Sequence, residues 1–154
     1  MPVEIERKFL VRGNDWRTDQ GVRIIQDYLN RDEERTVRVR IAGVRAFLTI
    51  KGMNTGAARA EFEYEIPLVD AEQLLKMCMG ALIEKTRYTV AYAGMIWEID
   101  EFHGENEGLV VAEVELEAAE QTFDRPEWLG LEVTADARYF NSNLAMRPYV
   151  SWHQ

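Results

Sequence analysis

The stretch that decides the fold is Val3-Glu4-Ile5-Glu6-Arg7-Lys8-Phe9-Leu10-Val11, in which charged and apolar side chains alternate. Successive side chains of a β-strand point to opposite sides, so Glu4, Glu6 and Lys8 share one face. Apolar side chains occupy the other face, where Arg7 is the one exception. The period of two therefore predicts a β-strand with an ionic side and an apolar side.

The same period recurs along the rest of the chain and predicts further strands, separated by polar breaks. These strands are expected at residues 21–29, 35–42, 46–51, 60–67, 85–92, 95–102 and 109–116. Together with the first, they are enough to close a barrel that holds a small ligand. The predicted fold class is therefore mainly β (α+β), an eight-stranded antiparallel closed β-barrel in a single domain over residues 1–154.

Helical signals are sparse in comparison. Asp70 is expected to cap a helix that runs to Gly80, and Thr134 to cap one that runs through Asn143 towards Met146. A shorter helical turn is expected over residues 118–122. Helices that are outweighed by strands in this way are expected to pack outside the barrel or to plug one of its ends.

Like charges stand side by side on the ionic faces of several predicted strands. They are Arg38 and Arg40; Glu61, Glu63 and Glu65; Lys85 and Arg87; Glu98 and Asp100; and Glu113, Glu115 and Glu117. Polar alternation usually means a solvated sheet face, but such a face normally mixes neutral and charged residues. Two carboxylates about 5 Å apart repel by roughly 3 kcal/mol at an effective dielectric of about 20. Hard divalent cations such as Mg²⁺ and Mn²⁺, which take oxygen ligands, would neutralise these rows if the ionic faces turn inward.

The cationic faces indicate a phosphate ligand. Guanidinium forks match phosphate oxygens, and lysine ammonium groups add compact positive charges. With the ionic faces turned inward, the cations that would cradle phosphates are Lys8, Arg38, Arg40, Lys51, Lys85 and Arg87. A linear polyphosphate would then lie between this cradle and metal ions on an acidic wall.

Composition excludes several other classes of protein. The net charge of −9 argues against general nucleic-acid or anionic-membrane partners. The sequence has no transmembrane run and no secretory signal pattern, so a cytoplasmic location is expected. The single cysteine, Cys78, excludes an internal disulfide framework. Outward apolar strand faces would support a homodimer as well as helix packing, so the oligomeric state stays open.

The opening segment Glu4-Ile5-Glu6-Arg7-Lys8-Phe9 resembles the N-terminal signature of the CYTH superfamily, the triphosphate tunnel metalloenzymes. Other segments follow in the family's order: Arg38-Val39-Arg40, Thr49-Ile50-Lys51-Gly52, Arg59-Ala60-Glu61-Phe62-Glu63, Glu84-Lys85-Thr86-Arg87-Tyr88, Glu98-Ile99-Asp100, Glu113-Val114-Glu115, Glu132-Val133-Thr134 and Arg138-Tyr139. The resemblance covers nearly the whole chain. It implies an eight-stranded tunnel that binds triphosphate-containing substrates with Mg²⁺ or Mn²⁺.

The resemblance also implies roles for individual residues. Those that resemble the metal-facing carboxylates are Glu4, Glu6, Asp100, Glu113 and Glu115, with Glu61 and Glu63 as further candidates. Those that resemble the phosphate-binding cations are Lys8, Arg38, Arg40, Lys51, Lys85 and Arg87, joined by Arg138. Lys8 and its tyrosine partner, Tyr28, are the expected catalytic residues. A lysine general base that assists the attacking water predicts an alkaline pH optimum.

The expected function is metal-dependent hydrolysis of inorganic tripolyphosphate, or of a related small triphosphate, as in the short bacterial tripolyphosphatases that the opening segment resembles. Thiamine triphosphatase and class IV adenylate cyclase are alternatives on the same fold, although no base-reading motif is present. A non-catalytic binder of polyphosphate or nucleotides is an alternative from another class. Such a binder would gain little from so many carboxylates facing an anion.

Overall fold

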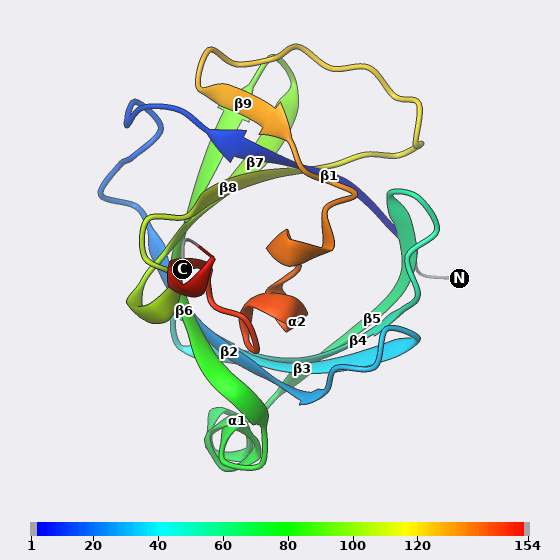
Figure 1. Ribbon diagram of the computed structural model, residues 1–154, viewed down its shortest axis with the longest axis vertical. Coiled ribbons are helices and arrows are strands. Elements are labelled where there is room, and N and C mark those ends of the chain that lie inside the picture. The colour runs from blue at the N-terminus through cyan, green and yellow to red at the C-terminus, as the bar shows by residue number, and fades with distance from the viewer. Residues whose placement is uncertain (1–2, 153–154) are drawn as a thin grey trace.

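Eight antiparallel strands close into a barrel in the computed structural model, which describes residues 3–152 (Figure 1). The strand order is β5-β4-β3-β2-β6-β7-β8-β1, and pairing between β1 and β5 closes the ring. The strands of the ring are β1 (Val3–Val11), β2 (Val22–Asn30), β3 (Arg35–Ala42), β4 (Arg45–Gly52), β5 (Ala58–Ile66), β6 (Met79–Tyr92), β7 (Met95–Phe102) and β8 (Val110–Glu115). The barrel predicted from the two-residue period is confirmed.

Two features of the sheet differ from the expectation. β6 begins at Met79 rather than at residue 85, because the chain re-enters the sheet directly after the preceding helix. A further strand, β9 (Leu129–Glu132), pairs with the end of β1 outside the ring. β1 thus has three partners in succession: β5 at its start, β8 along its middle and β9 at its end.

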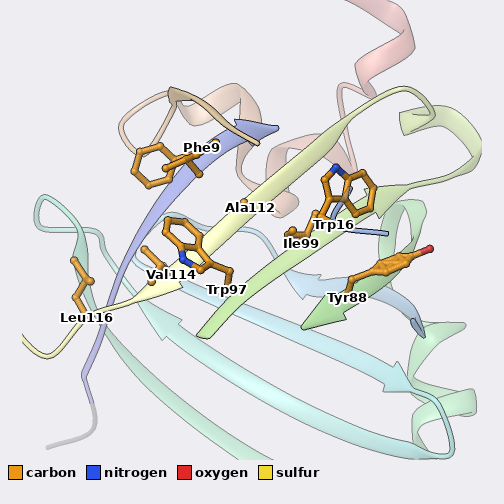
Figure 2. Packing of buried hydrophobic residues seen from close by; sticks show 9 residues of the cluster. Phe9, Trp16, Tyr88, Trp97, Ile99, Ala112, Val114 and Leu116 are labelled. Carbon is orange, nitrogen blue, oxygen red and sulfur yellow. The ribbon is translucent and has the colours of Figure 1, made fainter. Parts of the chain in front are cut away.

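The apolar strand faces point outward, where loops cover them. Phe9 of β1 and Trp97 of β7 are fully buried and meet edge to face, with ring centroids 5.8 Å apart (Figure 2). Phe123 and Trp128, from the segment between β8 and β9, pack edge to face against Trp97. Trp16, from the segment between β1 and β2, packs against the ring of Tyr88 in the same cluster. The main hydrophobic cluster therefore lies outside the barrel, against β1, β6, β7 and β8, which leaves the interior to polar side chains.

Helix α1 (Leu68–Leu75) lies outside the barrel (Figure 1). It begins after Pro67 and not at Asp70, which lies within its first turn, and it ends well before Gly80. Pro67 fixes its own φ and favours a helix start directly after it, so it overrides the capping preference of Asp70. The fully buried Ala71 packs against β3 and β4 in a satellite core.

The C-terminal segment plugs one end of the barrel, as Figure 1 shows for helix α2 (Asn141–Leu144). The prediction of a single long helix from Thr134 through Asn143 is wrong. Three short elements stand in its region: the 3₁₀ turns η2 (Ala137–Tyr139) and η3 (Tyr149–Ser151), with α2 between them. The Thr134 hydroxyl accepts a hydrogen bond from the backbone N–H of Lys8 and so is not a helix cap.

Apolar side chains seal the plugged end. Leu144 and Tyr139 of the C-terminal segment are buried in one cluster with Tyr28, Ile83 and Phe102 of the barrel strands. The remaining short helix is the 3₁₀ turn η1 (Gly104–Asn106), and residues 118–122 form no helix, contrary to the expectation. Within residues 3–152, no helix is long and apolar enough to cross a membrane.

Candidate active site

The ionic strand faces turn inward and line a cavity of about 250 Å³. Its cationic lining consists of Lys8, Arg38, Arg40, Lys51, Arg59, Lys85 and Arg87. Its acidic lining consists of Glu4, Glu6, Glu61, Glu63, Glu98, Glu113 and Glu115. The two sets are equal in number, so a multiply charged anion could enter only with additional cations to balance it. Thr36, Thr49, Tyr28 and the plug residues Thr134, Phe140, Asn141 and Ser142 complete the wall around these groups.

Asp100 anchors the cationic wall from behind. Its carboxylate is fully buried and accepts a 2.7 Å bond from Lys85 Nζ and bonds of 2.7 and 2.9 Å from Arg87 Nε and Nη2. Burial raises the pKa of Asp100, but Arg87 and Lys85 outweigh burial and hold it well below its ordinary value. Both oxygens are bonded by cations of β6, and Asp100 is not among the residues that line the cavity, although its charge still acts on Glu113.

Two cations on this wall lie in an environment that disfavours their charge, whereas for Arg87 burial is outweighed by the neighbouring Asp100, which raises the pKa well above its ordinary value. Burial lowers the pKa of Lys85 to about 7, even though Asp100 opposes the shift; Arg87 and Arg40 add repulsion. Burial and repulsion from Arg38 and Arg87 likewise lower the pKa of Arg40 to about 9. Such depressed values mean that an anion placed among these groups would be strongly stabilised.

The acidic wall contains carboxylates that lie close to one another. Burial raises the pKa of Glu6 well above its ordinary value, and repulsion from Glu113 and Glu4 adds to the effect. Burial would also raise the pKa of Glu113, but Lys8, with Nζ 4.0 Å away, and a hydrogen bond from Glu6 bring it to about 2. Glu6 and Glu113 therefore lie close enough for each carboxyl group to change the pKa of the other. This part of the wall carries more carboxylates than its cations neutralise.

Lys51 lies between two further carboxylates. Its Nζ is 2.9 Å from Glu4 Oε1 and 3.3 Å from Glu61 Oε2. Burial raises the pKa of Glu61, against the attraction of Lys51. The pKa of Glu115 is raised too, by burial and then by Glu4 and other acidic neighbours. The acids of β1, β5 and β8 thus form one continuous surface.

The structure places the two expected catalytic residues on the same cavity. Lys8 Nζ donates to the backbone oxygen of Tyr139 at 3.3 Å, and Tyr28 lies at the plugged end. Across residues 3–152, no hydrogen bond joins the Lys8 and Tyr28 side chains. Arg138 is not brought to the cavity, because its exposed guanidinium is held by Asp136 at 2.7 Å.

Several lining residues were not among the predicted site residues. Arg59, whose role the sequence left open, lines the cavity and donates to the Gly52 carbonyl at 3.2 Å. Glu98 lines it beside Arg87, and its place on the ionic face of β7 was a signal that could have identified it. Asn141 also lines the cavity, and the fully buried Gln26 bonds to it from β2; both are polar residues without charge, so the charge pattern gave no indication of them.

Comparison with known proteins assigns the family. Residues 2–149 match the CYTH domain. The chain belongs to the CYTH family. This CYTH protein is 46% identical to an inorganic triphosphatase of Acetivibrio thermocellus over the full length of both chains. It is 38% identical to an inorganic triphosphatase of Nitrosomonas europaea, over 94% of this chain and 97% of the relative.

A solved structure has the same fold. The crystal structure of an inorganic triphosphatase superposes on this CYTH protein with a TM-score of 0.67. The two sequences are 37% identical, and the match covers 95% of this chain and 96% of that one. The overall fold of this chain is therefore shared with a relative of known structure.

Membership of this metalloenzyme family implies a divalent metal ion, and the acidic wall fits one. The fit rests on the donor set, because five carboxylates line this wall, Glu4, Glu6, Glu61, Glu113 and Glu115, and in the part of the chain that the structure describes only Lys8 and Lys51 form ion pairs with them. The raised pKa of Glu6, Glu61 and Glu115 agrees with this excess of negative charge. Within residues 3–152, no three acidic side chains stand together as a ready-made metal site. Lys51 occupies the space between Glu4 and Glu61, so these carboxylates would have to exchange the ammonium group for a metal.

Proposed function

We propose that this CYTH protein hydrolyses inorganic tripolyphosphate to phosphate and pyrophosphate with Mg²⁺ or Mn²⁺. The observation that carries the proposal is the enclosed cavity with a cationic wall facing an acidic one. A linear phosphate chain is narrow enough for a barrel of this size and provides oxygens along its whole length. The full-length similarity to inorganic triphosphatases supports the same substrate.

The cationic wall would bind and orient the phosphate chain. Arg38 and Arg40 project from β3, and Arg87 from β6, so guanidinium forks reach the cavity from the two strands that flank β2. Asp100 keeps Arg87 in place through two hydrogen bonds, which reduces the entropy that this side chain loses on binding. Phosphoryl transfer depends mainly on positioning and charge neutralisation, and this arrangement supplies both.

The acidic wall would hold the metal. The residues suited to it are Glu4, Glu6, Glu61, Glu113 and Glu115, with Glu63 at the edge, where it accepts from Thr49 Oγ1 at 2.8 Å. A divalent cation bound there would neutralise phosphate oxygens and lower the pKa of a bound water. Asp100 is left out of this set because its oxygens are already bonded by Lys85 and Arg87.

Lys8 is the proposed group that moves the proton of the attacking water. It lies between Glu113 on one side and the plug on the other, with Nζ 5.7 Å from the centre of the Phe140 ring. Lys8 thus lies where the acidic wall meets the cations that are proposed to bind phosphate. Tyr28 lines the same cavity and is proposed as its partner on the substrate side.

One assay tests the proposal and its alternatives. Purified protein is incubated with tripolyphosphate, ATP or thiamine triphosphate, each with Mg²⁺, with Mn²⁺ or with a chelator. The expected result is metal-dependent release of phosphate from tripolyphosphate, whereas cyclic AMP from ATP would indicate the cyclase. Lys8→Ala should lower turnover by roughly 100-fold or more, a typical contribution of a general base. Lys76→Ala, at an exposed lysine beside α1, is the matched control and should have no effect. Turnover by Lys8→Ala within a few-fold of the parent protein would refute the role of Lys8.

A further inference from the structure

A chain of hydrogen bonds joins two cavity cations to the plug. Arg40 Nε donates to Gln26 Oε1 at 2.8 Å, and Gln26 Nε2 donates to Asn141 Oδ1 at 3.0 Å. Lys85 Nζ donates to the same Asn141 oxygen at 2.9 Å. Gln26 is fully buried in β2, and Asn141 is the first residue of α2. The plug is therefore hydrogen-bonded to the cavity cations through the side chain of Asn141, which also lines the cavity.

The chemistry of the end groups fixes the orientation of both amides. A guanidinium group only donates hydrogen bonds, so Arg40 must face the oxygen of Gln26. The nitrogen of Gln26 is then left to face Asn141, where the oxygen accepts a second bond. A flipped amide at either position would set two donors against each other. The orientation of Asn141 is therefore determined without ambiguity.

This orientation leaves the Asn141 Nδ2 group with its two N–H donors. Lys85 and Gln26 hold the Oδ1 atom, and within residues 3–152 the Nδ2 atom donates to no protein acceptor. Asn141 lines the cavity beside Phe140 and Ser142. Below it the barrel is sealed by the apolar cluster that contains Leu144. A phosphoryl group that reaches this point meets an N–H donor and has no room to continue.

We propose that Asn141 donates a hydrogen bond from Nδ2 to the terminal phosphoryl group of the substrate, at the closed end of the tunnel. The inference rests on the proposed function and adds a substrate-binding residue to it. Gln26 and Lys85 act as positioning partners, since together they hold Oδ1 and so aim Nδ2 at the cavity. The bound phosphoryl group is thereby the end of the chain and not an interior unit.

Two substitutions separate substrate binding from a structural role. Asn141→Asp keeps an oxygen for Lys85 and Gln26 but replaces the N–H donor by a negative charge next to the phosphate. Asn141→Ala removes both functions. The matched control is Asn143→Ala, which removes the same amide from the same helix, where it bonds the Ala137 carbonyl away from the cavity.

Steady-state kinetics with tripolyphosphate and metal ions give the main readout. Asn141→Ala and Asn141→Asp should each raise KM by roughly 10- to 100-fold, as expected for loss of a hydrogen bond to a charged group. The value of kcat should fall by a smaller factor than KM rises, because Asn141 is proposed to bind the substrate and not to move a proton in the reaction. The Asn143→Ala control should leave KM unchanged. A purely structural role predicts instead that Asn141→Asp behaves like the parent protein, because the bonds to Lys85 and Gln26 persist.

The kinetics and a calorimetric titration of the parent protein with tripolyphosphate together distinguish failure of the inference about Asn141 from failure of the proposed function. If the parent protein cleaves tripolyphosphate and Asn141→Asp has its KM within twofold of the parent value, the inference about Asn141 is wrong and the proposed function stands. If the parent protein neither cleaves nor binds tripolyphosphate, the proposed function is wrong and the inference falls with it. An effect of Asn141→Ala that becomes smaller in a Lys85→Ala background would support the coupling of the two side chains.

Discussion

Replacing Asp100 by Asn tests the idea that one buried carboxylate holds the cationic wall together. The substitution conserves shape and keeps one oxygen acceptor, but it removes the charge that faces Lys85 and Arg87. Both cations are largely buried, so neither can recover its lost partner by turning fully into water. Asp100→Asn should therefore destabilise the fold and disorder the cradle together.

The size of the effect follows from the burial of the pair. Removing one partner of a buried ion pair typically costs about 3–5 kcal/mol. Lys85 can relieve part of this cost by losing its proton, since its pKa is already lowered to about 7 and Asp100 is the main group that opposes the shift. We therefore expect a loss of about 3 kcal/mol in the free energy of unfolding at pH 7, the lower end of that range.

Urea unfolding measures this loss, and the same strand offers a control. Glu98 also faces Arg87, at 3.4 Å, but its side chain is 44% exposed. Glu98→Gln should cost less than about 1 kcal/mol, as for other exposed ion pairs. With a slope of about 2 kcal/mol per M, Asp100→Asn should lower the midpoint by about 1.5 M at unchanged slope. Equal losses for the two variants would show that burial of Asp100 does not determine the strength of this contact.

Three further predictions concern pH, metal binding and the backbone. Burial raises the pKa of Asp27 to about 6, so the folded protein keeps a proton that the unfolded chain releases near pH 4. The stabilisation that this proton provides is therefore present below about pH 4 and is lost as the pH rises through 6. Asp27→Asn should remove this pH dependence of the unfolding free energy and stabilise the protein at pH 8 by at most about 3 kcal/mol in urea unfolding. An unchanged pH dependence would contradict the raised pKa of Asp27. Mn²⁺ should raise the melting temperature of the parent protein and of the exposed control Glu65→Gln by similar amounts, and that of Glu6→Gln by much less. Equal shifts for all three proteins would exclude Glu6 from the metal site. Gly80→Ala should lower stability by more than about 1 kcal/mol, since φ is +79° and a Cβ would lie 2.9 Å from the carbonyl oxygen that follows α2; Gly56→Ala, at φ +64° with open space around it, should cost less, and a thermal melt that ranks them the other way would disprove the clash.

The barrel could be predicted from sequence because its signal is local. The period of two in β1 and β3 marks both strands, and their observed bounds agree with the prediction. The inward direction of the ionic faces followed from the repulsion between neighbours such as Glu113 and Glu115. Each of these arguments needs only residues that lie close together in the chain. The strand β9 gave no such signal, because four residues that include Gly130 are too few for a period.

The position of each side chain along the barrel axis could not be predicted in the same way. Alternation assigns Glu98 and Asp100 to one face, but only the register that sets Asp100 opposite Arg87 shows that it lies behind the cations. The contact of Asn141 with Lys85 joins residues 56 positions apart in the chain. Nothing near either residue specifies how far the plug enters the barrel. That distance depends on packing within the cluster of Tyr28, Phe102 and Leu144.

The three successive partners of β1 have a consequence for biosynthesis. β1 leaves the ribosome first, yet β8, which pairs with Glu6 to Leu10, is made more than a hundred residues later. Domains built on such distant pairings fold slowly, and Glu6 to Leu10 stay without their β8 partner until residues 111–115 have been made. The charged side chains along one face of β1 keep this segment hydrated before it pairs. Glu6 and Lys8, which are proposed to take part in metal binding and catalysis, lie in this late pairing, so the proposed site is complete only after β8 has joined β1.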